Sequence, residues 1–135
     1  MPMIPVSAFM MLACARLGAI HSVVFGGFAA KELTNRIEDC HPKLIITSSC
    51  GLEPGKTVKY RPIVDEALEL CKGFENPKKE IKRLIVQRRD VFEEKGLPKD
   101  EYYDYDDLMA EEEDIAECVP VESIHPLYIL CKLLL

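Results

Sequence analysis

The sequence has 135 residues, of which 48% are hydrophobic, and this suits one ordinary domain with a buried core. Its 23 acidic side chains outnumber the 17 basic ones and leave a net charge of -6. No overall positive field would attract phosphate polymers or anionic lipids, so we expect neither nucleic acid nor a membrane as a partner. Residues 1–5 lack the basic start and long apolar stretch of a signal peptide, and we expect no targeting segment in this chain.

Six cysteines are scattered along the chain without a C-x-x-C pair or the dense spacing of a disulfide framework. This pattern predicts reduced thiols in a reducing compartment. Cys40 and His41 form a close pair of metal-binding residue types, but adjacent side chains point apart in any regular element. We therefore predict no metal site.

Hydrophobic periodicity alternates between the helical and the extended kind along the chain. The expected elements are, in order, a buried helix over 6–17 that stops at Gly18, a strand over 20–25 closed by a turn at Gly26-Gly27, a helix over 30–37 ended by His41-Pro42, a strand over 44–47, a long loop over 48–60, a helix over 62–71, a strand over 84–86, one short helix in an exposed stretch over 100–117, and a core strand over 127–130. This order predicts an α/β fold in which helices cover both faces of a parallel sheet. The first helix follows no full strand and the last strand precedes no helix, so we expect a partial parallel-sheet subdomain.

Residues 51–57, GLEPGKT, follow a predicted strand and resemble the phosphate-binding loop of nucleotide hydrolases. Only three residues separate the glycines, whereas that motif requires four, because successive backbone amides must wrap a phosphate before a helix begins. Residues 58–62 also fail to start a helix at once. We therefore reject a P-loop.

Gly26-Gly27 is another candidate for ligand contact, because glycine lets a backbone approach a ligand closely. The competing interpretation is a turn that simply needs positive φ, and spacing alone favours it. Lys56 could offer a cation to a phosphate, although a solvated lysine is the commoner outcome. Its neighbour Glu53 would weaken such a site.

Two long segments carry a specific resemblance, MPMIP at residues 1–5 and MLACARLGAIHSVVFGGF at residues 11–28. It continues less tightly in KEL at 31–33, RI at 36–37, GLEPGK at 51–56, VP at 119–120 and HPLYIL at 125–130. On these residues the chain resembles the AMP-forming short-chain acyl-CoA synthetases, which include the acetyl- and propionyl-CoA synthetases. Glu53 stands where acetyl-CoA synthetases usually show arginine, so the resemblance favours the mitochondrial, propionate-preferring branch.

The resemblance implies a two-step ligase reaction. ATP and a short-chain carboxylate give an acyl-adenylate and pyrophosphate, and the thiol of coenzyme A then displaces AMP. It also implies that this chain is a fragment of the large N-terminal α/β domain of such an enzyme. Its partners would be small-molecule substrates, coenzyme A and the carboxylate, and its location would be the mitochondrial matrix.

The resemblance also implies which residues contact the cofactor. Phe25, Gly26 and Gly27 match the family's turn beside coenzyme A, and the loop of Glu53, Pro54, Gly55 and Lys56 matches its loop near the nucleotide end of that cofactor. The family places arginine where Lys56 stands, so the charge is kept but the planar fork is lost. No catalytic residue and no metal ligand is carried over.

The chain departs from the family after Leu130. The family continues with a tyrosine and a Thr/Ser/Gly-rich loop that holds the ATP phosphates, whereas this chain ends in Cys131-Lys132-Leu133-Leu134-Leu135. We therefore divide it into an incomplete synthetase domain over 1–130 and a divergent tail over 131–135. The ATP and Mg²⁺ site is absent, so we expect no catalysis by this chain alone.

Two alternatives to an inactive synthetase fragment stay open. One is a stand-alone module that binds coenzyme A or another adenine nucleotide. The other is a non-catalytic interaction protein that associates through the apolar, nearly uncharged run over 128–135, which would be an unpaired sheet edge.

Overall fold

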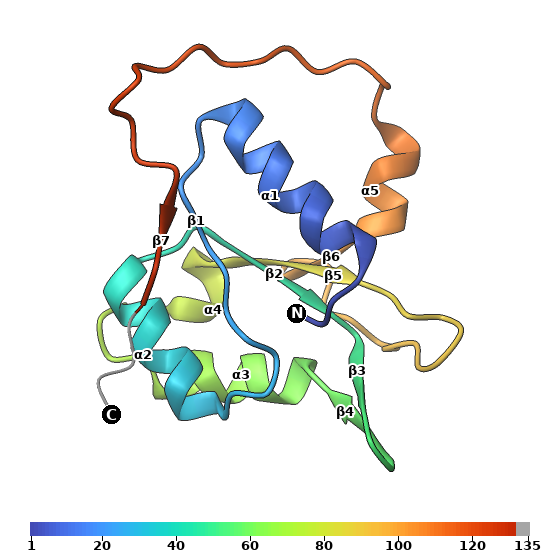
Figure 1. The fold of residues 1–135 in the computed structure, drawn as a ribbon. Coiled ribbons are helices and arrows are strands. Elements are labelled where there is room, and N and C mark those ends of the chain that lie inside the picture. Colours follow the sequence, from blue (N-terminus) through green and yellow to red (C-terminus); the bar gives the residue numbers. More distant parts are fainter. Residues whose placement is uncertain (132–135) are drawn as a thin grey trace.

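A computed structural model of the chain describes residues 1–131 (Figure 1). The predicted tail over 131–135 therefore lies outside the described residues, apart from Cys131. The elements are α1 (Pro5–Leu17), β1 (His21–Ser22), α2 (Ala30–Cys40), β2 (Leu44–Ser48), β3 (Cys50–Glu53), β4 (Lys56–Lys59), α3 (Arg61–Leu70), α4 (Pro77–Glu80), β5 (Lys82–Val86), β6 (Tyr102–Asp104), α5 (Tyr105–Glu111) and β7 (Tyr128–Ile129).

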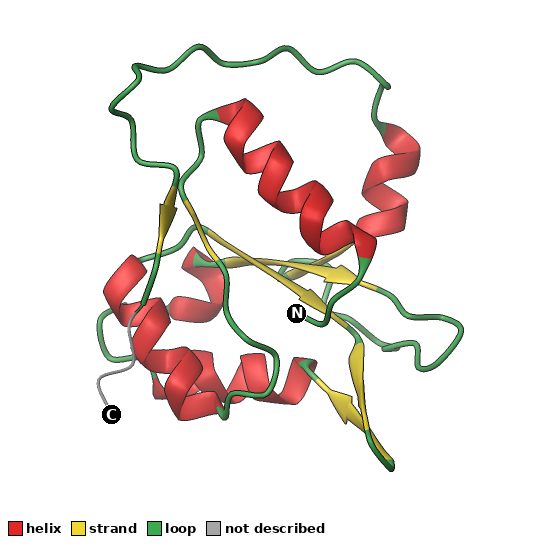
Figure 2. Cartoon of the chain, viewed as in Figure 1, coloured by secondary structure: helices red, strands yellow, loops and turns green. Residues whose placement is uncertain are grey.

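A three-stranded parallel sheet in the order β2-β5-β6 forms the centre of the fold. Its middle strand is buried except at Lys82 and ends in the apolar residues Leu84, Ile85 and Val86, as a parallel strand covered on both faces requires. Figure 2 shows α1 and α5 on one side of this sheet and α2, α3 and α4 on the other. The predicted α/β class with a parallel sheet is confirmed.

The buried core lies where α2 packs on α3. Its members are Ala30, Ile37, Val64, Ala67, Leu68, Cys71 and Ile81. Small alanines let the two helices approach closely, and the Thr34 hydroxyl donates to the backbone oxygen of Ala67 at 3.0 Å. A hydrogen bond in this buried position fixes how the two helices pack.

The helix predicted over 6–17 is present as α1, but the prediction that it is buried is wrong. Gly18 ends it with φ of 66°, as expected of a left-handed C-terminal cap. No residue of α1 is buried, and Phe9 and Leu12 are 55% and 64% exposed. The extended segment near Val119 contacts its C-terminal end, where the Val119 amide donates to the Arg16 oxygen at 2.8 Å.

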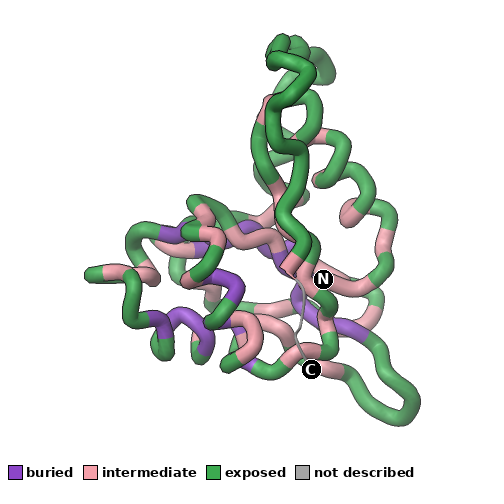
Figure 3. Tube along the Cα trace, turned by 60° about the vertical axis from the view of Figure 1, so that its left-hand side comes forward, coloured by how far each residue is buried: buried purple, intermediate pink, exposed green. Residues whose placement is uncertain are grey.

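Both outer strands are shorter and more exposed than predicted. The strand expected over 20–25 is only His21–Ser22, and it pairs in parallel with Tyr128–Ile129. β7 is exposed and is not part of the core, with Tyr128 53% exposed, as the green stretch over 112–130 in Figure 3 shows. A two-residue pairing cannot bury either strand.

The loop predicted over 48–60 is instead an antiparallel hairpin of β3 and β4. Pro54-Gly55 forms its turn, with φ of 77° at Gly55, and proline followed by a positive-φ glycine is a favoured β-turn pair. The Ser, Gly, Pro and Lys residues clustered here are typical of loops, so the sequence pattern did not predict these two short strands. The rejected P-loop is also absent in the structure, because residues 51–57 lie within the hairpin.

Two elements of the second half were not predicted. Helix α4 is a single turn, and β6 lies in the acid-dense stretch over 100–117 that we expected to be exposed. The expected short helix is present there as α5. None of the helices within residues 1–131 is both long and apolar enough to cross a membrane.

Candidate functional site

The turn at residues 25–27 lies between β1 and α2. Phe25 is 72% exposed and meets the Phe28 ring edge-on, with centroids 5.8 Å apart. The Phe28 ring also contacts Arg36 of α2, whose guanidinium carbon lies 4.2 Å from the ring centroid. Arg36, a buried residue of α2, therefore anchors an exposed turn.

The two glycines of this turn allow other side chains to approach the backbone closely, and they are not needed for a positive φ. The glycines with positive φ among residues 1–131 are Gly18, Gly55 and Gly96. A Cβ on Gly26 would lie 2.5 Å from the Tyr60 hydroxyl, and a Cβ on Gly27 would lie 2.5 Å from the Phe25 ring. The interpretation that spacing favoured, a turn requiring positive φ, is therefore wrong.

Glu53, Pro54, Gly55 and Lys56 lie together at the exposed tip of the hairpin. Glu53 and Lys56 are its last register pair, and their side chains form an ion pair at 3.0 Å. Open space surrounds Gly55, where an added Cβ would meet nothing within 4 Å. The Lys56 ammonium is thus exposed and partly neutralised by Glu53, as the sequence predicted, and such an exposed pair stabilises the fold only weakly.

Tyr60 joins these two predicted regions, and the sequence reasoning missed it. Its phenol lies against Gly26 of the turn and against Gly51 of β3, where an added Cβ would be 2.8 Å from the Tyr60 Cζ. The turn at 25–27 therefore lies at the base of the hairpin. Lys56 at the tip is four residues before Tyr60, a distance of roughly 13 Å at about 3.3 Å per residue. A glycine inside a strand often marks such a close approach, so Gly51 was the available signal.

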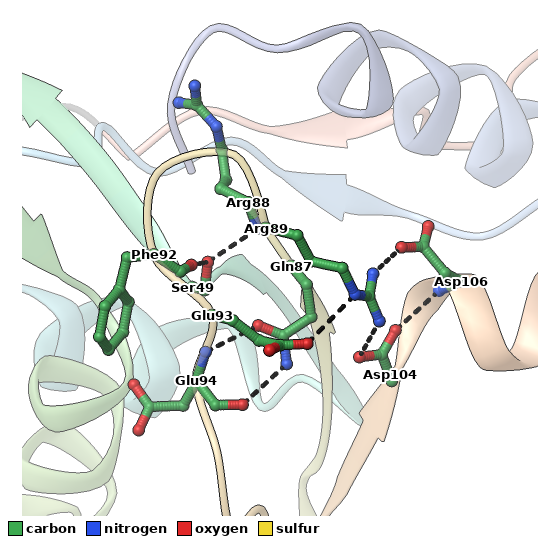
Figure 4. A network of polar contacts seen from close by, with 9 residues as sticks. All are labelled: Ser49, Gln87, Arg88, Arg89, Phe92, Glu93, Glu94, Asp104 and Asp106. Atoms are coloured by element: carbon green, nitrogen blue, oxygen red, sulfur yellow. Dashed lines mark hydrogen bonds and ion pairs between the residues drawn. The ribbon is translucent and has the colours of Figure 1, made fainter.

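The base of the hairpin is fixed from the other side by a polar network (Figure 4). The Ser49 hydroxyl donates to the Phe92 oxygen at 2.7 Å and accepts from the Arg88 amide at 2.9 Å. Gln87 exchanges hydrogen bonds with the backbone of Glu94 in the same loop. The residue directly before β3 is thereby held at the end of the central strand.

Arg89 is the most prominent cation of this network, and its charge is used within the fold. It pairs with Glu93 at 3.2 Å, with Asp104 at 3.1 Å and with Asp106. Three carboxylates leave this guanidinium with no net attraction for an anion. Residues 1–131 also contain no group of three or more His, Cys, Asp or Glu side chains placed to hold a metal.

Comparison with known proteins assigns the chain to a family. Residues 1–130 match the family described as AMP-binding enzyme. This chain belongs to the AMP-binding enzyme family. A relative within it, the human protein named acyl-CoA synthetase short-chain family member 3, mitochondrial, is 48% identical over 130 residues, or 96% of this chain. The acetyl-coenzyme A synthetase of Xanthobacter autotrophicus is 45% identical over 131 residues.

A solved structure shares the fold of this AMP-binding enzyme segment. The acetoacetyl-CoA synthetase of Streptomyces lividans superimposes with a TM-score of 0.76 over 96% of this chain, at 20% sequence identity. The chain spans 18% of the length of the human relative and 18% of the solved structure. The resemblance to short-chain acyl-CoA synthetases, as a segment of one, is confirmed.

Proposed function

We propose that this chain supplies part of the coenzyme A-facing wall of an AMP-forming short-chain acyl-CoA synthetase. The complete reaction would convert propionate or acetate, ATP and coenzyme A into acyl-CoA, AMP and pyrophosphate. The names of the human and bacterial relatives support the reaction class, and the higher identity to the mitochondrial relative supports the propionate-preferring branch and a location in the mitochondrial matrix. In this proposal residues 1–130 are one incomplete synthetase domain.

The observation that carries the proposal is that two exposed regions, the turn at 25–27 and the hairpin, meet through Tyr60. The turn offers the exposed ring of Phe25 and the exposed residue Gly27, and the hairpin tip offers the exposed ammonium of Lys56. Coenzyme A is long and carries phosphates at its nucleotide end. A cation at the tip of the hairpin and an exposed aromatic turn at its base suit contacts at two points along such a ligand.

Calorimetry with coenzyme A tests the binding part of this proposal. Saturable heat that weakens in Lys56→Glu supports it, since the substitution places a second carboxylate beside Glu53. Lys79→Glu makes the same charge change on exposed α4 and is the matched control. Absence of heat at millimolar coenzyme A contradicts the proposed site.

We also propose that the 135-residue polypeptide does not catalyse by itself. Its relatives use a chain more than five times as long, on which ATP and Mg²⁺ would bind elsewhere. A coupled assay of pyrophosphate release with ATP, propionate and coenzyme A should give only background. Turnover above background contradicts this point and leaves the binding proposal unaffected.

Two alternative functions, a stand-alone binding module and an interaction protein, can be distinguished from a synthetase segment by simple measurements. A stand-alone binding module would bind coenzyme A with full affinity but show no turnover in any combination with synthetase segments. An interaction protein is favoured by one observation, the exposure of β7 and of Leu130, which is 78% exposed. Size-exclusion chromatography decides this alternative, because a clean monomer at all concentrations excludes self-association through β7.

A further inference from the structure

Tyr60 is fixed in the backbone on both sides. Its amide donates to the Ser49 oxygen at 3.3 Å, which extends the base of the hairpin. Its own oxygen accepts from the Val64 amide at 3.0 Å, which begins α3. The backbone position of Tyr60 is therefore fixed, because moving it would break a hydrogen bond either to the hairpin base or to α3.

Opposite edges of the Tyr60 ring face the two glycines. A Cβ on Gly26 would lie 3.5 Å from Cε1, and a Cβ on Gly51 would lie 3.1 Å from Cε2 on the other edge. The hydroxyl and Cζ lie close to both positions. The ring thus fills the space between the turn at 25–27 and β3, and neither glycine has room for a side chain while the ring is present.

The ring is held by packing. No hydrogen bond of its hydroxyl to another residue of the described chain meets ordinary geometry, although Glu53 and Cys50 lie close enough to affect it. Burial is the main cause that raises the pKa of Tyr60, followed by the charge of Glu53. The phenol is therefore neutral at physiological pH and acts through its shape.

We propose that Tyr60 is a positioning residue, whose ring sets the spacing between the turn at 25–27 and the hairpin at 50–59 and thereby aligns both with one ligand. This inference rests on the proposed coenzyme A site for its ligand. The spacing itself does not depend on that site. Without the ring, the turn would lose its support at the hairpin base, and the two ligand-facing regions would no longer keep a constant separation.

The sharpest test is a double-mutant cycle between residues 26 and 60. Gly26→Ala should lower the unfolding temperature in the wild-type background, because its methyl group collides with the phenol. In the Tyr60→Ala background the same change should cost far less, since the collision is gone. Gly55→Ala adds a methyl group at a positive-φ position in open space, where the cost is backbone strain, and this cost should be the same in both backgrounds. Equal costs of Gly26→Ala in both backgrounds overturn the inference.

Coenzyme A affinity is the second measurement. Tyr60→Ala should weaken binding about tenfold, as expected when ligand-facing groups lose their fixed spacing, whereas Tyr60→Phe keeps the ring and should restore it. Unchanged affinity in Tyr60→Ala overturns the positioning role while leaving the site in place. If the wild-type chain binds no coenzyme A, the proposed function fails, and the cycle between residues 26 and 60 still decides the spacing role.

Discussion

The Tyr102 hydroxyl donates a hydrogen bond of 2.6 Å to a carboxylate oxygen of Asp65, and this bond joins the edge strand β6 to α3. Tyr102 is 4% exposed, and the guanidinium of Arg83 lies 4.7 Å from its ring centroid. Burial, the hydrogen bond to Asp65 and the charge of Asp65 raise the pKa of Tyr102 well above its usual value of 10.0. Tyr102 thereby ties the edge strand of the sheet to the helix α3 on its face.

The raised pKa of Tyr102 predicts a loss of stability in alkali. An unfolded tyrosine ionises near pH 10, whereas the folded one stays protonated, so above about pH 10 the folded state binds more protons and the free energy of unfolding falls as pH rises. Urea unfolding between about pH 8 and pH 11 should show this slope. Tyr102→Phe should reduce the slope. Tyr103→Phe, at an exposed neighbouring residue, should leave it unchanged, and equal slopes in all three proteins contradict the prediction.

Arg83 is a fully buried cation of the central strand, so we expect the stability of the fold to depend strongly on its partner Glu101. Its guanidinium pairs with Glu101 and donates to the Lys78 oxygen at 2.8 Å. Glu101→Leu should lower the free energy of unfolding by about 2 kcal/mol, less than for a fully buried partner, because Glu101 is partly exposed to solvent. Urea denaturation measures this change.

The double variant Arg83→Met/Glu101→Leu supplies the control. Removing both charges leaves no unpaired buried cation, so its loss of stability should be smaller than that of Glu101→Leu alone. Glu69→Gln breaks the exposed pair with Lys78 and should have little effect. A double variant less stable than Glu101→Leu would mean that Arg83 acts mainly through packing.

The hydrogen bonds of Ser49 lead us to expect that the stability of the hairpin depends on its contacts with the end of the central sheet. Its buried hydroxyl joins Phe92 and Arg88, so Ser49→Ala should destabilise the fold by about 1–2 kcal/mol through the unsatisfied backbone groups. Amide hydrogen exchange should accelerate in β3 and β4 more than in α3. Ser123→Ala, at an exposed serine, should do neither. A uniform change in exchange would show that Ser49 acts on global stability only.

The exposed apolar surface of α1 predicts association of the 135-residue polypeptide. Phe9 and Leu12 are three residues apart and share a helical face, and an apolar patch of this kind is rarely left uncovered in a monomer. Sedimentation equilibrium should show self-association that weakens in Phe9→Ser/Leu12→Ser. Met109→Ser, at an exposed residue of α5, should have a smaller effect. A monomer before and after substitution contradicts the prediction.

Errors in the predicted elements have a common origin. The pattern over 6–17 correctly predicted a helix but wrongly predicted that it is buried. Apolar periodicity shows that a segment is helical, but it does not show which other elements cover the helix. The hairpin over 50–59 was missed because short strands with exposed polar residues depend on their pairing and have little signal of their own. Tyr102 was grouped with an exposed stretch, although β5 and α3 bury it.

The sequence by itself determined the α/β class, most of the helices and strands and the family, because these follow from local spacing and from residues matched in order along the chain. Only the tertiary structure decided why Gly26 is glycine, which residue joins the turn to the hairpin, and which partners Arg83 and Tyr102 have. Contacts between residues distant in sequence depend on how the elements pack. No local pattern around Gly26 or Gly51 specifies that the ring of Tyr60 lies between them.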